Sequence, residues 1–137
     1  MPFPGNNDLL KLPKTAFLSS RKISPTAVLK CYDWATQERD KGTCIISGFH
    51  SPLEKDVLTF LLKGKQPIIL VMGRALYKQI PDLLQNPLKE KRLLLISPVS
   101  QTIMHQSRQS CFTRNNYIIE MADKVVFGSL DEKGSLY

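Results

Sequence analysis

Two short stretches of the sequence combine hydroxyl, basic and glycine residues in a way suited to holding an anion. The first reads Ser19-Ser20-Arg21-Lys22-Ile23-Ser24, and the second reads Ser47-Gly48-Phe49-His50-Ser51. Hydroxyl groups donate to anionic oxygens, glycine lets a ligand approach the backbone, and Arg or Lys supplies compensating charge. Each stretch also leads into a Ser-Pro pair, which is typical of a helix start, where free N–H groups favour negative charge. These residues predict a site for a phosphate or a similar anion.

Other chemistries find less support in the residues. The sequence contains neither G-x-G-x-x-G nor the P-loop pattern, and its three cysteines include no C-x-x-C. His50 and His105 lack metal-ligand spacing, so we expect no metal and no cofactor. Cys111 with His105 could form a nucleophilic pair, but no acid lies nearby to orient it. Glu54 offers a carboxylate for hydrolysis of an N-glycosidic bond, although a capping-box role at a helix start explains it more simply.

Short apolar runs separated by helical patterns must position these residues. The runs predict strands at 15–19, 43–47, 67–72, 92–97 and 124–127. Helices are predicted at 25–41 between Ser24 and Gly42, at 52–63 between Ser51 and Gly64, at 75–85 with an interruption at Pro81, and at 113–121. A long polar loop is predicted at 98–112, and an irregular lead-in at 1–14 before a single domain at 15–137.

The strands do not alternate apolar with polar residues, which is typical of strands buried on both faces. Together with the strand–helix alternation, this predicts an α/β fold: a three-layer, Rossmann-like, mostly parallel sheet of about five strands with helices on both faces. Ligands of such sheets bind outside the carboxyl ends of the strands. Both opening stretches follow strands directly, and Gly73 follows the third. We therefore expect all of them to meet at one edge.

Charge and hydropathy narrow the class of protein. The chain of 137 residues carries 19 Lys and Arg against 12 Asp and Glu, and this net charge of +7 permits a polyanionic partner. The longest apolar run, 68–72, is far shorter than the roughly 20 residues of a membrane helix. No signal-peptide core follows Met1. We expect a cytoplasmic protein that does not enter the membrane.

Four elements in collinear order resemble the Rossmann-like core of the DNA-processing protein A (DprA/Smf) family. The loop at 19–24 is similar to the family's G-S-R followed by a helix-starting Ser. The second strand ends in Ser47-Gly48, as the family's Ser-Gly element does. The stretch 112–119, Phe-Thr-Arg-Asn-Asn-Tyr-Ile-Ile, is similar to F-x-x-R-N-R-I-I. The last strand is followed by Gly134-Ser135-Leu136, similar to the family's closing turn.

The resemblance implies binding of single-stranded DNA and help in loading a recombinase. It assigns Arg21, Arg114 and Asn115 to a pocket, which is lined by Ser20, Ser47, Gly48 and the run Lys133-Gly134-Ser135. Phe49 and His50, bulkier than the glycine-rich family stretch, could narrow this pocket or stack on a base. A homodimer is a further implied possibility.

Four interpretations follow from these observations. The first is a binding module for single-stranded DNA through its phosphates. The second is a binder or sensor of a nucleotide or another phosphorylated small ligand, without catalysis. The third is an enzyme that uses Glu54, and the fourth is a degenerate domain that only packs against a partner protein. Function depends on the site rather than on the fold, so the geometry of the strand ends must discriminate among them.

Overall fold

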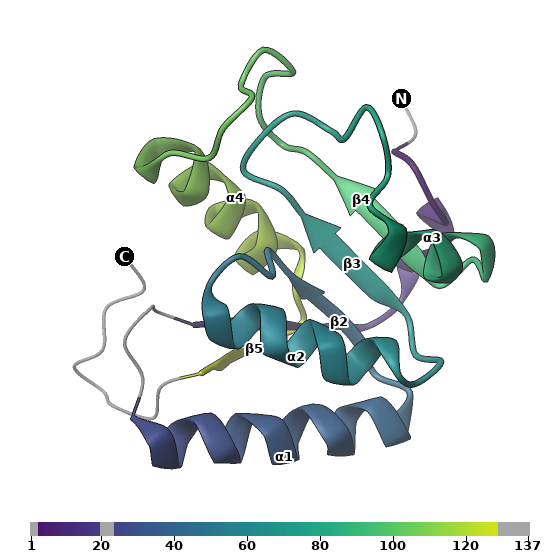
Figure 1. Cartoon of the computed structure of the whole chain (residues 1–137), viewed down its shortest axis with the longest axis vertical. Coiled ribbons are helices and arrows are strands. Elements are labelled where there is room, and N and C mark those ends of the chain that lie inside the picture. The colour runs from purple at the N-terminus through teal and green to yellow at the C-terminus, as the bar shows by residue number, and fades with distance from the viewer. Residues whose placement is uncertain (1–2, 20–23, 129–137) are drawn as a thin grey trace.

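The computed structural model describes residues 3–19 and 24–128. Within this part, the chain forms a sheet of five strands (Figure 1). They are β1 (Lys14–Leu18), β2 (Cys44–Ser47), β3 (Ile68–Val71), β4 (Leu93–Ile96) and β5 (Lys124–Phe127), in the spatial order β4-β3-β2-β1-β5. Every neighbouring pair is parallel. Strands β2, β3 and β4 are buried along their whole length, which explains their unbroken apolar sequences.

Helices cover both faces of the sheet. In the described part, α1 (Pro25–Lys41), α2 (Pro52–Leu62) and α3 (Asp82–Lys89) pack on one face around the side chains of Phe17, Ile45 and Leu95. On the opposite face, α4 (Arg108–Met121) and the 3-10 helix η1 (Asn7–Lys11) pack against Ala16, Ile46 and Leu94. The predicted three-layer, Rossmann-like fold class is therefore confirmed.

The order of the strands explains why α4 lies alone among the longer helices of its face. From β1 to β4 the chain moves in one direction across the sheet, with its helices on one face. It then returns over the opposite face through α4 and adds β5 on the far side of β1. Right-handed crossovers require this change of face when the direction reverses. As a result, α4 begins above the carboxyl ends of the strands, where the sequence predicts the site.

The predicted starts of α1 and α2 and the stop of α1 are confirmed, whereas α2 ends at Leu62 with Lys63 as its C-cap instead of closing at Gly64. The hydroxyl oxygen of Ser24 accepts from Ala27 N, and α1 ends at Gly42 in the left-handed conformation, with φ of 77°. Ser51 and Glu54 form the predicted capping box of α2. These signals depend on residues within four positions of one another, so they can be recognised without the fold.

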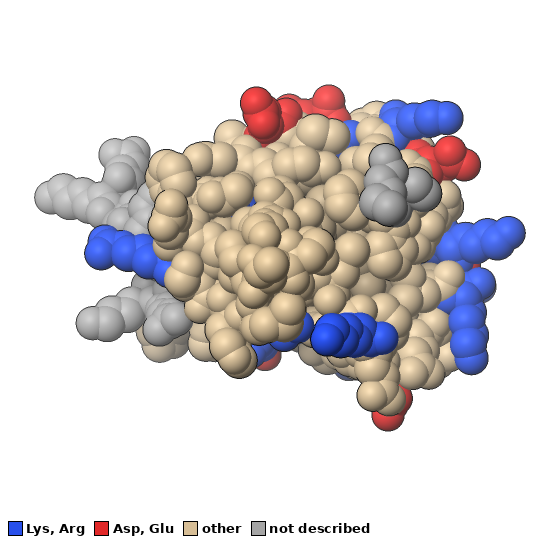
Figure 2. Space-filling view, turned by 90° about the horizontal axis from the view of Figure 1, so that it is seen from above, with Lys and Arg blue, Asp and Glu red and all other residues tan. Residues whose placement is uncertain are grey.

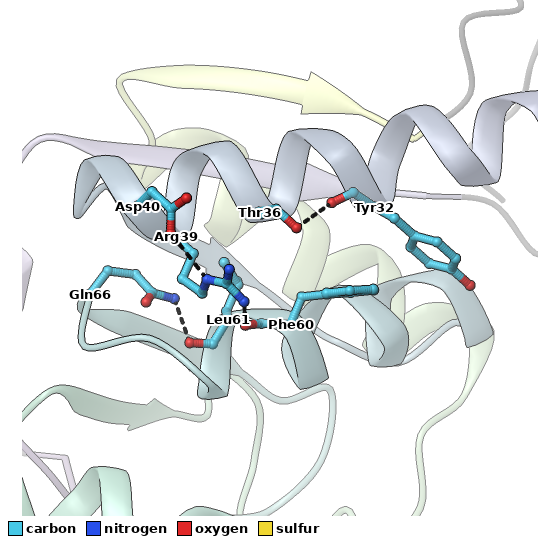
Figure 3. A network of polar contacts seen from close by, with 7 residues as sticks. All are labelled: Tyr32, Thr36, Arg39, Asp40, Phe60, Leu61 and Gln66. Atoms are coloured by element: carbon cyan, nitrogen blue, oxygen red, sulfur yellow. Dashed lines mark hydrogen bonds and ion pairs between the residues drawn. The ribbon is translucent and has the colours of Figure 1, made fainter.

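The C-terminal end of α2 is held by side chains of its neighbours (Figure 3). Arg39 of α1 donates from Nη1 to the carbonyl of Phe60, and Gln66 donates from Nε2 to the carbonyl of Leu61. These side-chain bonds supplement the backbone bonds that Lys63 N and Gly64 N make to the same two carbonyls at the end of the helix. They also bind α1 to α2 at the edge of the sheet away from the predicted site.

The helix predicted at 75–85 with an interruption at Pro81 is wrong before that proline and confirmed for 82–85. Residues 73–81 are not helical, and α3 starts only after Pro81, which is its N-cap. Pro81 has no N–H to donate and disfavours helical geometry in the residue before it. Instead, Ala75 N donates to the carbonyl of Ile103 and Leu76 N to the side chain of Gln101. The backbone of this segment thus finds its partners in a distant loop.

The polar loop predicted at 98–112 is shorter than expected, because α4 begins at Arg108 instead of Thr113. Ser107 and Ser110 form a reciprocal capping box that starts the helix. The predicted lead-in also contains ordered structure besides η1. Gly5 pairs with Leu94 in an antiparallel bridge along the outer edge of β4. Within the described residues, none of the helices is long and apolar enough to cross a membrane.

Candidate anion-binding site

The carboxyl ends of the strands bring together residues from four separate parts of the sequence. Ser19 follows β1, Gly48 follows β2 and Gly73 follows β3, and the parallel register places these ends at one edge of the sheet. Helix α4 reaches this edge from the opposite face and contributes Arg114. The structure therefore brings four of the predicted site residues to the same edge of the sheet.

Arg114 lies directly against the end of β2. A Cβ atom added to Gly48 would stand only 2.7 Å from Nε of Arg114 and 2.9 Å from its Cζ. Real Cβ atoms do not approach other atoms this closely, so the guanidinium occupies the space that a side chain at position 48 would need. The glycine of the predicted Ser-Gly element is thus required for Arg114 to reach the strand end.

The guanidinium of Arg114 is buried, and no carboxylate of the described residues pairs with it. The residue is 5% exposed. Its Nε donates to Oδ1 of Asn115 at 3.1 Å, and its Nη1 donates to Oε1 of Gln106 at 2.8 Å. Among residues 3–19 and 24–128, the ion pairs join other side chains and do not include it. Neutral amide oxygens therefore surround a buried positive charge, which is an environment that favours an anion.

Gln106, which the sequence did not indicate, connects α4 with the ends of β2 and β3. Its Oε1 accepts from Arg114, and its Nε2 lies 3.1 Å from Nδ1 of His50 beyond β2. The same Oε1 lies 3.0 Å from the position of a Cβ added to Gly73. Because Oε1 faces the arginine, Nε2 is the donor to His50, and Nδ1 of that ring is the acceptor. Nothing in the local sequence around Gln106 distinguishes it from other polar loop residues.

Glu54 is buried among backbone donors. Its Oε1 accepts from the N–H groups of His50 at 2.9 Å and Ser51 at 3.1 Å, and its Oε2 accepts from Ser19 N at 2.9 Å. The residue is 2% exposed. Its carboxylate ties the end of β1 to the start of α2, at a helix N-terminus where negative charge is favourable. These three bonds favour the capping interpretation over a role as a catalytic carboxylate.

Phe49 lies in the core instead of at the surface. It is 5% exposed and packs in the cluster that contains Leu53 and Met72. Its φ of 46° is unusual for a bulky residue, and its N–H donates to the hydroxyl oxygen of Ser47. The interpretation that the Phe49 ring stacks on a base therefore does not fit its burial. His50 is partly exposed and remains at the strand end.

The remaining predicted residues divide into those with local roles and those that the structure does not describe. Ser24 and Ser51 cap α1 and α2 through their hydroxyl oxygens. Asn115 is buried and orients Arg114. Six predicted residues lie outside the described part of the chain: Ser20, Arg21, Lys22, Lys133, Gly134 and Ser135.

The surface around the strand ends carries little charge in the described part. Figure 2 views the molecule from the side toward which the arrows of β3 and β4 point in Figure 1. Most of this face is uncharged, and the Lys and Arg side chains lie toward its margins. Among the described residues, no group of three His, Cys, Asp or Glu side chains could hold a metal ion. The arrangement thus provides a local positive site in place of a broad basic surface.

The fold and the site together define a Rossmann-like domain with an arginine at the carboxyl ends of its strands. The sequence model of the family described as DNA recombination-mediator protein A matches residues 2–137. The chain therefore belongs to this family, as its sequence resemblance indicated. A search of curated proteins finds no match.

Solved structures show the same fold. DNA processing protein A from Helicobacter pylori has a TM-score of 0.73 and 21% identity, covering 95% of this chain and 60% of its own. The Streptococcus pneumoniae protein has a TM-score of 0.69 and 23% identity, covering 91% of this chain and 44% of its own. A molybdenum cofactor carrier protein from Chlamydomonas reinhardtii has a TM-score of 0.56 and 10% identity, covering 88% of this chain and 64% of its own. The chain thus spans less than two thirds of the length of these relatives.

Proposed function

We propose that the chain binds single-stranded DNA through its phosphates at the carboxyl ends of β1, β2 and β3, in DNA processing or recombination. The observation that carries this proposal is the buried guanidinium of Arg114, which has no carboxylate partner in the described part of the chain. An uncompensated buried charge is costly, and a phosphate offsets that cost with charge-assisted hydrogen bonds. Membership of the family supports the proposal, because the Helicobacter pylori relative binds single-stranded DNA.

Several of the predicted residues have a role in this proposal. Arg114 contacts a phosphate oxygen, while Gly48 and Gly73 keep the strand ends free of side chains that would fill the site. Arg21 and Lys22 neutralise neighbouring phosphates. The lining that the resemblance implies is completed by Ser20, Ser47 and the run Lys133-Gly134-Ser135, and Ser19 lies beside it at the end of β1.

A polarisation titration of a labelled single-stranded oligonucleotide tests the proposal, at about 50 mM and about 200 mM salt. Three proteins are compared: wild type, Arg114→Gln and the matched control Arg108→Gln. Arg108 lies on the same helix and is exposed, so its variant removes the same net charge without touching the site. We expect Arg114→Gln to weaken binding by about tenfold or more, the loss of one or two hydrogen bonds to a charged group. The slope of log K against the logarithm of the salt concentration should also become shallower by about 0.7, the value for one lost phosphate contact.

Equal losses in both variants would mean that net charge alone attracts the DNA. Absence of binding at low salt would overturn the proposal outright. Circular dichroism of the Arg114→Gln protein checks that its fold is retained. The variant Arg21→Ala extends the same test to the predicted residues outside the described part.

A second candidate function is the binding of a nucleotide or another phosphorylated small ligand. The observation that favours it is the burial of Arg114, which is 5% exposed and therefore suits a small ligand enclosed at the strand ends. A ligand present at 100 times its dissociation constant raises the stability by about 2.7 kcal/mol. A thermal shift with mononucleotides that disappears in Arg114→Gln, with no binding of the oligonucleotide, would favour this candidate over DNA.

Three finer proposals concern partners and place, of which the recombinase rests on the family resemblance. We propose that the chain acts with a recombinase, that it forms a homodimer and that it is cytoplasmic. Sedimentation equilibrium tests the dimer directly. Retention of a purified recombinase on the immobilised chain, with and without single-stranded DNA, tests the partner.

A further inference from the structure

Arg114 is 5% exposed, so an incoming phosphate cannot reach it unless a covering side chain moves. Its two hydrogen-bond partners differ in origin. Asn115 is its neighbour on α4, whereas Gln106 lies in the loop before that helix. We propose that Gln106 is a built-in competitor of the anion: its carboxamide oxygen occupies the place on Arg114 that a phosphate oxygen takes, and the site opens when Gln106 swings away. This inference rests on the proposed function of the same site.

The geometry places the carboxamide oxygen where a ligand would be expected. It lies 2.8 Å from Nη1 of Arg114, a usual length for a hydrogen bond from a charged donor. It also lies in contact with Gly73, whose missing side chain leaves room for it, at the end of β3. The amide nitrogen of the same group reaches His50 at the end of β2. One neutral group thus fills the space between two strand ends and the arginine, outside the carboxyl edge where ligands of such sheets bind.

Gln106 is held by side-chain bonds, which include a weak one from Sγ of Cys111 to its Oε1 at 3.5 Å. Within the described chain, residues 104–106 make no backbone–backbone hydrogen bonds, unlike Ile103, which bonds to both Ala75 and Ser100. Met104 and His105 are exposed, and Gln106 itself is partly exposed. A phosphate offers several charged oxygens, and charge-assisted hydrogen bonds are about twice as strong as neutral ones. The ligand can therefore displace the carboxamide.

The two possible roles of Gln106, competing with the anion or positioning Arg114, predict opposite changes in affinity when its side chain is removed. If Gln106 positioned the guanidinium for the ligand, its removal would weaken binding. If it competes, removal raises the fraction of open sites and strengthens apparent binding in proportion. A carboxylate at the same position would form an ion pair with Arg114 and keep the site closed.

The experiment compares Gln106→Ala and Gln106→Glu with the matched pair Gln109→Ala and Gln109→Glu. Gln109 is exposed on the first turn of α4, and its side chain has no part in the site. Binding of the labelled single-stranded oligonucleotide is the first readout. The second is modification of Arg114 by phenylglyoxal, followed by peptide mass spectrometry, with the exposed Arg108 as internal reference. The second readout reports access to the guanidinium whatever the ligand is.

We expect Gln106→Ala to bind about threefold to tenfold more tightly and to expose Arg114 to faster modification. Gln106→Glu should bind about tenfold more weakly than Gln109→Glu, which adds the same charge, and should protect Arg114. Weaker binding by Gln106→Ala, or unchanged modification of Arg114, would overturn the competitor role. If no protein bound the oligonucleotide while Gln106→Ala still exposed Arg114, the proposed DNA binding would fail, and the result would support only that Gln106 covers the guanidinium.

Discussion

Replacing Glu54 by glutamine tests how the strand ends are held together. The change conserves shape, removes the charge and turns one acceptor oxygen into an NH₂ donor. Oε1 serves two backbone N–H groups and Oε2 serves one, so the favoured orientation keeps an oxygen toward His50 and Ser51. The new NH₂ group then faces Ser19 N, which loses its acceptor in a buried environment.

The expected cost follows from these three bonds. A buried N–H without an acceptor costs about 1–3 kcal/mol. Each of the two remaining bonds changes from charged to neutral, which weakens it by about 1 kcal/mol, and the cheaper burial of an amide returns part of this. We expect Glu54→Gln to lower the free energy of unfolding by about 2–4 kcal/mol. For a chain of this size, each kcal/mol lowers the melting temperature by about 2–4 °C or slightly more.

Urea denaturation measures this loss as a shift of the midpoint with an unchanged slope. Glu120→Gln is the matched control, because Glu120 is exposed on α4 and should change stability by less than about 0.5 kcal/mol. If the Glu54→Gln protein were as stable as this control, the three hydrogen bonds of the Glu54 carboxylate would not hold the strand ends together. Loss of nucleoside monophosphate turnover in a fully stable variant would instead favour the enzyme interpretation.

Three further predictions concern the scaffold. Burial raises the pKa of the Cys44 thiol from 9.0 to about 11, so the stability that the neutral thiol provides is complete below pH 9 and lost on rising to pH 11. Wild type should therefore lose about 2–3 kcal/mol more than Cys44→Ala over that interval in alkaline denaturation, and equal losses would contradict this. Gly5→Ala should release the segment bound to β4, because its Cβ would collide with the carbonyl oxygen of Leu93. Amide exchange at Leu95, which donates to Pro4, should then accelerate, and no acceleration would contradict the clash. Ser107→Ala should cost about 1 kcal/mol by removing the N-cap of α4, measured by thermal unfolding, and an unchanged melting temperature would contradict this role.

The strands and the first two helices could be predicted because their signals are local. Ser24 with Gly42, and Ser51 with Glu54, lie at the ends of the helices that they start or stop. The apolar runs identified all five described strands; β2, β3 and β4 are buried throughout, which disfavours polar side chains, whereas β5 at the edge of the sheet is partly exposed. The same reasoning failed between Gly73 and Pro81, where the backbone bonds to a loop more than twenty residues away.

The candidate site was predicted in its parts but not in its assembly. Gly48, Gly73 and Arg114 were recognised from residue type and from resemblance, whereas Gln106 and the burial of Phe49 were not. The sequence alone determined which residues follow each strand, because the end of a strand and the cap of the next helix are set by residues adjacent in the chain. Only the tertiary structure decided that α4 crosses the opposite face and brings Arg114 and Gln106 onto the two glycines. The physical reason is that such contacts depend on strand order and helix packing, which arise from burial of the whole core and not from any one segment.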